Sequence, residues 1–415
     1  MVNICSRAVQ CGHSFSIYFD SSLRLVQLFT NFTQSLLPEL FQLSQNASRK
    51  SHQIFNSLFV SSSVFNMAIT QDNHFWVESE DWHTAGEPFR IISKYPPHHE
   101  MEGENVAQRR LNIIGKPEHP LDLLRQSLCH EPRGHADMYG GFITPPDDSS
   151  ALFGVLFWHK DGFSTACGHG TIALGYWAIA HKMLPVPENG VVDVVIDVPS
   201  GRVISRITTK DFKPIHAEFI QVLSYQIAKD VMVTIPSLGF DITTDLIYSG
   251  AVYASIDASQ LNLEVEPKNC YDFIKIGREF RASLGKRGQY RSHDLYAIIF
   301  FNEDGDSQDE ANVIRQRNVV VFADGQIDRS PCGSGTAARV TTLLNQGRFK
   351  AGISQLRHRS IIGTTFEADV VSEEACPIEN FKGCIPRVRG QAYLVGRMNF
   401  FIDPADPVFP GFLLR

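Results

Sequence analysis

The sequence predicts an α/β protein built from two similar lobes that face each other across a cleft. One short phrase occurs twice: residues 167–173 read CGHGTIA and residues 332–338 read CGSGTAA. Each copy follows a strand-like run and opens a segment of helical periodicity. Thirty glycines would serve the turns that such strand–turn–helix units need. This shared context makes a chance match of small residues the weaker explanation.

Five short apolar runs rich in β-branched residues predict strands. These runs cover residues 151–158, 190–198, 230–236, 295–301 and 318–324. Two other segments, 171–181 and 336–347, place apolar residues at i, i+3 and i+4 and therefore predict helices. Each half of the chain is thus expected to hold a strand, a glycine-rich turn and a helix.

The composition is that of a soluble globular protein. Hydrophobic residues make up 43% of the 415 residues and charged residues 20%, with a formal net charge of −7. A negative chain gives no reason to expect nucleic acid or an anionic membrane as partner, so a small molecule is favoured. The eight cysteines show neither zinc-like spacing nor a disulfide framework, and no metal site is predicted.

The first 66 residues differ from the rest because they are rich in serine and poor in acids. We expect a disordered extension, or a stretch that precedes a true start at Met67. An organelle transit peptide is the alternative, although only four basic residues support it. The expected location is cytoplasmic, with mitochondrial import through residues 1–66 left open.

The two repeated cysteines, Cys167 and Cys332, are the candidate reactive groups. A helix start carries unpaired N–H groups and a partial positive charge, which lower the pKa of a thiol to roughly 3.5–7.5 in known cases. The same N–H groups can hold a carboxylate. Two facing sites of this kind would put two thiols on opposite sides of one bound carboxylate compound.

That arrangement suits inversion of the carbon next to a carboxylate. One thiolate removes the α-proton on one face, and one thiol returns a proton on the other. Nothing indicates a pyridoxal site, so backbone N–H groups would stabilise the carbanion. A cysteine protease needs only one reactive cysteine and would not explain a second copy of the phrase. A metal site on Cys167 and His169 lacks further ligands. A redox pair would not need the glycine-rich helix starts.

Five segments of the chain, from about residue 75 to the C-terminus, resemble the proline racemase family. They are HTAGEPFRII (83–92), EPRGHADMYGGF (131–142), GFSTACGHGTIALG (162–175), DRSPCGSGTAAR (328–339) and FIDPADPVFPGFLL (401–414). The family includes 4-hydroxyproline 2-epimerases and trans-3-hydroxy-L-proline dehydratases. The resemblance implies an enzyme that needs no cofactor and binds proline or hydroxyproline, and it allows a homodimer.

The family fold implied for this chain has two pseudo-symmetric lobes of the diaminopimelate-epimerase type. Each lobe is a curved sheet around a central helix, and the active site lies in the cleft between them. We expect residues 67–205 to form the first lobe, with the C-terminal strands 385–415 returning to it. Residues 206–384 would form the second lobe.

The resemblance also assigns roles to individual residues. It implies that Cys167 and Cys332 are the two catalytic acid–base groups. The substrate-binding positions are Gly168, His169, Asp328, Gly333 and Ser334. Backbone N–H groups of the glycines, His169 and Ser334 would hold the carboxylate, while the Asp328 carboxylate and the His169 ring would steady the ring nitrogen. For His83 and His135 a structural role is expected.

Three departures from the family pattern leave the substrate less defined than the chemistry. Ala166 stands where methionine is common, Ser334 replaces the commoner threonine, and Ser249 interrupts a Y-G-G segment. The dehydratases commonly carry threonine in place of the second cysteine, so Cys332 favours a racemase or epimerase. The neighbouring residues are closer to the dehydratases, which therefore remain the alternative. A catalytically silent binding homologue is the third hypothesis.

Overall fold

The computed structural model describes residues 74–96, 99, 101–305 and 312–414. The chain divides into two units, 1–73 and 74–415, and the second holds every element given below. The predicted extension, residues 1–66, lies outside the described residues. Within the described part, no helix is long and apolar enough to cross a membrane.

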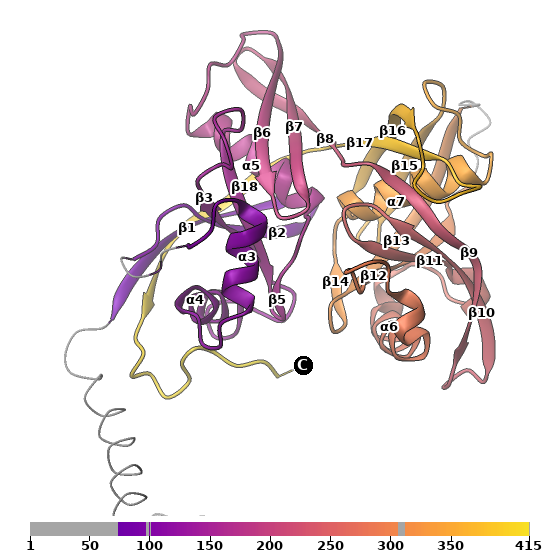
Figure 1. Cartoon of the computed structure of the whole chain (residues 1–415), viewed down its shortest axis with the longest axis horizontal. Coiled ribbons are helices and arrows are strands. Elements are labelled where there is room, and N and C mark those ends of the chain that lie inside the picture. The colour runs from indigo at the N-terminus through magenta and orange to yellow at the C-terminus, as the bar shows by residue number, and fades with distance from the viewer. Residues whose placement is uncertain (1–73, 97–98, 100, 306–311, 415) are drawn as a thin grey trace, which may run out of the picture. The chain divides into compact units, whose positions relative to one another are not determined.

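Eighteen strands of the described residues are linked by hydrogen bonds into one continuous sheet (Figure 1). The first series is β1 (Phe75–Thr84), β2 (Glu87–Ile92), β3 (Tyr139–Thr144), β4 (Phe153–His159), β5 (Gly162–Phe163), β6 (Gly190–Val198), β7 (Gly201–Lys210) and β8 (Lys213–Ile220). The second series is β9 (Ser224–Ile235), β10 (Phe240–Tyr248), β11 (Val252–Asp257), β12 (Leu295–Glu303), β13 (Val313–Phe322), β14 (Gln326–Asp328), β15 (Gln355–Ser360), β16 (Thr365–Glu374), β17 (Gly383–Gly390) and β18 (Ala392–Ile402).

The two series repeat one pairing pattern. In the first, β1–β2 is antiparallel, β2–β3 parallel, β3–β4 antiparallel and β4–β6 parallel. In the second, β10–β11, β11–β12, β12–β13 and β13–β15 follow the same sequence of directions. The short strands β5 and β14 occupy equivalent places, each pairing with the strand before it. The fold therefore has the two pseudo-symmetric α/β lobes that the sequence predicted.

Each lobe encloses one central helix. Helix α5 (Gly168–Ala180) follows β5 and contacts β7 and β8, whereas α7 (Gly333–Asn345) follows β14 and contacts β16 and β17 (Figure 1). In α5, residues 168–179 are all buried, and their apolar side chains surround the helix, as expected of a helix covered on every side. Helix α7 carries buried threonines, whose hydroxyls bond to carbonyls one turn back, such as Thr341 to Ala337.

Three further helices were not predicted. They are α3 (Val106–Ile114), α4 (Pro120–Cys129) and α6 (Cys270–Leu284), accompanied by the 3₁₀ turns η1 (Ala258–Leu261), η2 (Pro267–Asn269) and η3 (Gly285–Gly288). Helices α3 and α4 connect β2 to β3, and α6 connects β11 to β12. Because both of these strand pairs are parallel, each needs a long crossover, and the helices form those connections.

The elements predicted from periodicity are confirmed in type and differ only at their ends. The five strand segments coincide with β4, β6, β9, β12 and β13, and the two helical segments coincide with α5 and α7. The lobe limits remain a prediction. We propose that the change of lobe falls between β8 and β9, because β8 still pairs with β7 and β9 with β10.

Matched leucines test how far the central helix supports the fold. Leu174 of α5 is completely buried, whereas Leu111 of α3 is 57% exposed. We expect Leu174→Ala to lower the free energy of unfolding by about 2–5 kcal/mol, because it leaves a cavity in the core. Leu111→Ala should change it by less than about 0.5 kcal/mol. Urea unfolding followed by circular dichroism measures both; equal losses would contradict the central position of α5.

Candidate active site

The two central helices begin at one point. Cys167 is the N-cap of α5 and Cys332 the N-cap of α7. Each sulfur accepts a hydrogen bond from the backbone N–H three residues later, Gly170 in one case and Gly335 in the other, both at 3.3 Å. The repeated phrase of the sequence therefore forms the same cap twice.

The helix starts touch through glycine. A Cβ atom on Gly168 would lie 2.7 Å from the Cα atom of Gly333, and one on Gly333 would lie 2.7 Å from that of Gly168. No real Cβ atom approaches another carbon so closely, so any larger residue would force the helices apart. The glycines at these two positions are required by the contact itself.

A small cavity of about 20 Å³ lies at this meeting point. It is lined by Tyr139, Ala166, Cys167, Gly168, His169, Tyr253, Tyr296, Val320, Phe322, Asp328, Cys332, Gly333 and Ser334. All seven residues predicted from the sequence are in this set. The volume is that of about one water molecule. A compound of the size of proline can therefore enter only when the surrounding residues move apart.

The two thiols are less acidic than their position at helix starts suggested. Burial raises the pKa of both Cys167 and Cys332 well above the usual value of 9, and the N–H bonds from Gly170 and Gly335 only partly oppose this. The negative charge of Asp328 raises both pKa values further. The expectation of a lowered pKa is therefore wrong for the closed site, because desolvation of the thiolate outweighs the helix ends.

His169 lies beside the first thiol but does not activate it as an ion pair. Its Nδ1 atom is 3.4 Å from Cys167 Sγ. Burial, together with the positive charge of Arg329, lowers the pKa of His169 to about 3, so the ring is neutral at pH 7. A neutral imidazole does not form the thiolate–imidazolium pair of a cysteine protease.

Asp328 is connected to the second thiol. Its Oδ1 atom accepts bonds from the N–H of Ser330 at 2.8 Å and from the Ser330 hydroxyl at 2.7 Å. The Ser330 Oγ atom in turn accepts the N–H of Cys332 at 3.0 Å. Cys332 has φ +62°, which few residues other than glycine adopt and which costs about 1–3 kcal/mol. The Asp328–Ser330 pair helps to hold this backbone.

Three tyrosines of the cavity were not predicted. The Tyr139 hydroxyl bonds to Ser164 and lies 3.2 Å from that of Tyr296, while Tyr253 bonds to Ser334. Burial raises the pKa of all three tyrosines well above 10, so they are neutral hydroxyl groups. They come from β3, β11 and β12, where a pattern of alternating apolar residues gives no sign that a tyrosine faces a ligand.

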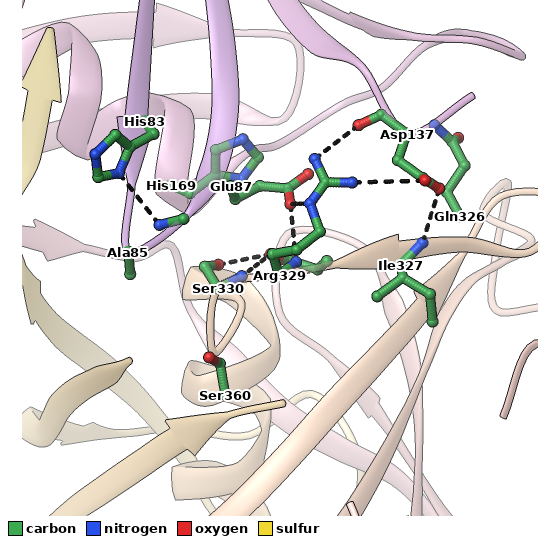
Figure 2. Close-up of polar contacts among 12 residues, drawn as sticks. His83, Ala85, Glu87, Asp137, His169, Gln326, Ile327, Arg329, Ser330 and Ser360 are labelled. Carbon is green, nitrogen blue, oxygen red and sulfur yellow. Dashed lines mark hydrogen bonds and ion pairs between the residues drawn. The ribbon is translucent and has the colours of Figure 1, made fainter. Parts of the chain in front are cut away.

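An ion-pair cluster, drawn in Figure 2, lies next to Asp328 of the cavity lining. Arg329, the neighbour of Asp328, makes contact with Glu87 and Asp137 of the first lobe. His83 lies at the edge of this view and accepts the N–H of Gly86 at 3.2 Å. Its bond stabilises the turn after β1, in agreement with a structural role. The expected structural role of His135 stays a prediction, although its ring accepts the N–H of Asp137.

The sequence matches the proline racemase family over residues 80–413. The chain belongs to the proline racemase family. It is 37% identical to a trans-3-hydroxy-L-proline dehydratase of Bacillus cereus, over 80% of this chain and 97% of the relative. It is 33% identical to a proline racemase of Clostridioides difficile, over 82% of this chain and 98% of the relative.

The fold is also that of a solved member of the family. A hydroxyproline epimerase from Agrobacterium vitis, with bound trans-4-hydroxy-L-proline, superposes with a TM-score of 0.73 at 25% identity. The match covers 82% of this chain and 96% of the epimerase. Relatives named for three different activities thus match this chain, so the family makes the chain an enzyme without selecting the reaction.

Substitution of one glycine tests the contact between the helix starts. We expect Gly168→Ala to separate α5 from α7 and to increase the rate at which iodoacetamide alkylates Cys167 and Cys332 by about tenfold. Peptide mapping by mass spectrometry measures each thiol. Gly396→Ala is the control, because a Cβ atom there has only ordinary van der Waals contact. An unchanged alkylation rate in Gly168→Ala would show that the helices need not touch.

Proposed function

We propose that this chain inverts the α-carbon of proline or hydroxyproline by a two-cysteine acid–base mechanism. One observation carries the proposal: two thiols cap two pseudo-equivalent helices that meet at a single buried cavity. A redox pair or a single nucleophile does not require that symmetry. Inversion does, because a proton leaves one face of the α-carbon and another arrives on the opposite face.

The substrate carboxylate would bind to backbone N–H groups at the two helix starts. Gly168 and His169 offer them from α5, and Gly333 and Ser334 from α7. The partial positive charge of both helix ends acts on the same group. As the α-proton leaves, negative charge spreads into the carboxylate, and these donors stabilise it in the transition state.

The substrate ring nitrogen would supply the positive charge that the site lacks. Glu87, Asp137 and Asp328 are three carboxyl groups close to one cation, Arg329, and burial raises the pKa of Glu87 and Asp328, so a second cation is needed to hold them all ionised. A ring ammonium beside Asp328 balances this excess. The same ammonium favours the charged form of a nearby thiol and so opposes the effect of burial on its pKa. Substrate binding would therefore help to create the thiolate that reacts.

The catalytic step needs one thiolate and one thiol. The sulfur of one cysteine takes the α-proton, so that the C–H bond breaks and its electron pair passes into the carboxylate. The S–H of the other cysteine gives its proton to the opposite face. The enzyme is left with the proton on the first sulfur and the charge on the second, which is the state needed for the reverse reaction. Either Cys167 or Cys332 can begin the cycle.

The hydroxyl groups of the cavity favour hydroxyproline over proline. Tyr139, Tyr253 and Tyr296 are neutral, and each can donate one hydrogen bond and accept others. A ring hydroxyl would find a further donor or acceptor among them in addition to their bonds with one another and with Ser164 and Ser334, an interaction that proline cannot make. Sites built to bond a substrate hydroxyl discriminate against the compound that lacks it.

Dehydration of trans-3-hydroxy-L-proline is the second candidate, supported by the relative named for that activity at 37% identity. In this reaction one thiolate removes the α-proton, the ring C–O bond breaks, a C=C bond forms and the hydroxyl leaves as water. A buried S–H or phenol could protonate the leaving oxygen. The second thiol is not required on the opposite face.

Proton NMR in D₂O tests which reaction occurs. The enzyme is given L-proline, trans-4-hydroxy-L-proline or trans-3-hydroxy-L-proline in separate samples. We expect the α-proton signal to disappear as the inverted isomer appears, faster for a hydroxyproline than for proline. Cys167→Ser and Cys332→Ser should each lower inversion by about 10²–10⁴-fold, since each removes an acid–base group.

The same experiment has two contrary outcomes. Full inversion by Cys332→Ser would exclude the two-base mechanism. Consumption of the 3-hydroxy compound alone, with a dehydrated ring as product, would replace inversion by dehydration. A Cys384→Ser variant is the control for loss of a buried thiol, because Cys384 lies outside the cavity and bonds to Thr341.

The pH profile follows from the raised pKa of the thiols. Below that pKa both cysteines are protonated in the free enzyme, and the fraction with one thiolate rises about tenfold per pH unit. We therefore expect kcat/KM to increase continuously from pH 7 to pH 9. The increase in kcat should end at lower pH, because kcat reports the complex that contains the substrate cation. A kcat/KM that is already constant at pH 7 would contradict this.

A further inference from the structure

The side chain of Arg329 crosses from the second lobe to the first. Its Nε atom lies 2.9 Å from Glu87 Oε2, and its Nη1 atom lies 3.7 Å from Asp137 Oδ2. Its Nη2 atom also donates to the Asp137 carbonyl at 3.1 Å. Figure 2 shows the guanidinium between the two first-lobe carboxylates. Arg329 follows β14, whereas Glu87 opens β2, so this contact joins the two lobes.

First-lobe groups also hold the backbone on both sides of Asp328. The Arg329 N–H donates to Glu87 Oε2 at 2.8 Å, so one carboxylate oxygen accepts from both the backbone and the side chain of Arg329. On the other side, the Ile327 N–H donates to Asp137 Oδ1 at 3.3 Å, and the Gln326 amide donates to the Ala136 carbonyl at 2.8 Å. The backbone around Asp328, which β14 pairs with β13 of its own lobe, is thus held in addition by the opposite lobe.

Burial makes this contact sensitive to separation of the lobes. The Glu87 side chain has no exposed surface, and among the described residues its Oε1 atom has no hydrogen-bond partner. Burial raises the pKa of Glu87 well above its usual value, and the Arg329 guanidinium opposes this, so the carboxylate form of Glu87 depends on that cation. Glu87 and Arg329 therefore favour either the fully paired, closed arrangement or separate exposure to water.

We propose that Glu87 and Asp137, acting through Arg329, are positioning residues that place Asp328 and Cys332 correctly only when the lobes are closed. This inference takes the roles of Asp328 and Cys332 from the proposed function and rests on it. The connection is continuous: Glu87 and Asp137 fix the backbone around Asp328, Asp328 binds Ser330, and Ser330 holds the N–H of Cys332. Closure of the cleft and alignment of the second thiol become one event.

Arg329→Gln separates positioning from simple electrostatics. Loss of the cation alone would make the surroundings more negative, disfavour thiolates and slow alkylation by iodoacetamide. Loss of the contact between lobes would expose the thiols and accelerate it. We expect alkylation of Cys167 and Cys332 in the substrate-free enzyme to become about tenfold faster, with partial return toward the wild-type rate in Arg329→Lys.

Matched variants complete the test. Arg206→Gln is the control, because its partner Asp193 is on the adjacent strand of the same hairpin, at 2.7 Å. This control should leave alkylation unchanged. The double variant with Glu87→Gln and Arg329→Gln should be alkylated no faster than Arg329→Gln alone, because the effects of residues that act as one unit are not additive.

Catalysis provides the second readout. With the substrate that NMR identifies, Arg329→Gln should lower kcat/KM by about 10²-fold, with most of the loss in kcat, because misplacement of a reacting group by about 1 Å has that effect. Equal alkylation rates in Arg329→Gln and wild type, at an equal thermal midpoint, would overturn the proposal. If wild type converts none of the three compounds, the proposed function fails, and alkylation still decides the role of Arg329.

Discussion

The contact between Gly168 and Gly333 is the constraint on which the site depends. Because neither position can hold a Cβ atom, two helix ends, two thiols and several unpaired N–H groups share a cavity of about 20 Å³. A helix end normally meets solvent, which satisfies its free N–H groups. Here both ends are buried together. In the proposed mechanism their free N–H groups are satisfied by the substrate carboxylate and by the negative charge that develops on it.

Burial has a second effect, which is to disfavour the ionised forms of the cavity's side chains, and it raises the pKa even of Asp328. The thiols of Cys167 and Cys332 hold their protons, and His169 stays neutral. The phenols of the cavity do the same. Such a site cannot ionise itself at moderate cost, and in the proposed mechanism it would rely on the charges of a zwitterionic substrate. In the proposed mechanism, the same ligand charge therefore affects both which substrate binds and how readily the base thiol ionises.

The parts of the fold that could be predicted are those with a local signal. The repeated phrase located both caps, and β-branched runs located five strands, because these patterns depend on residues close in the sequence. Helices α3, α4 and α6 were missed although α6 has a clear apolar face. The parallel pairs β2–β3 and β11–β12 require these crossovers, but strand direction has no local signal in the sequence.

The site was predictable only where motif residues reach it directly. Tyr296 and Glu87 become part of it through strand pairing and contact between lobes, which no spacing in the sequence reports. The raised pKa of the thiols was missed for a related reason: a helix end is visible in the sequence, whereas the degree of burial that opposes it is a property of the assembled lobes.

The pseudo-symmetry is broken in the backbone of the two cysteines themselves. Cys167 has extended backbone with φ −155°, whereas Cys332 has φ +62°. Two enantiomers in water nevertheless have the same free energy, so an enzyme that interconverts them must have equal kcat/KM in both directions, however unequal its two bases are. The strained backbone can only shift kcat and KM together for one enantiomer relative to the other. With a hydroxyproline the two forms are diastereomers, and the ratio then reflects the free energies of the ring isomers in solution rather than any preference built into the protein.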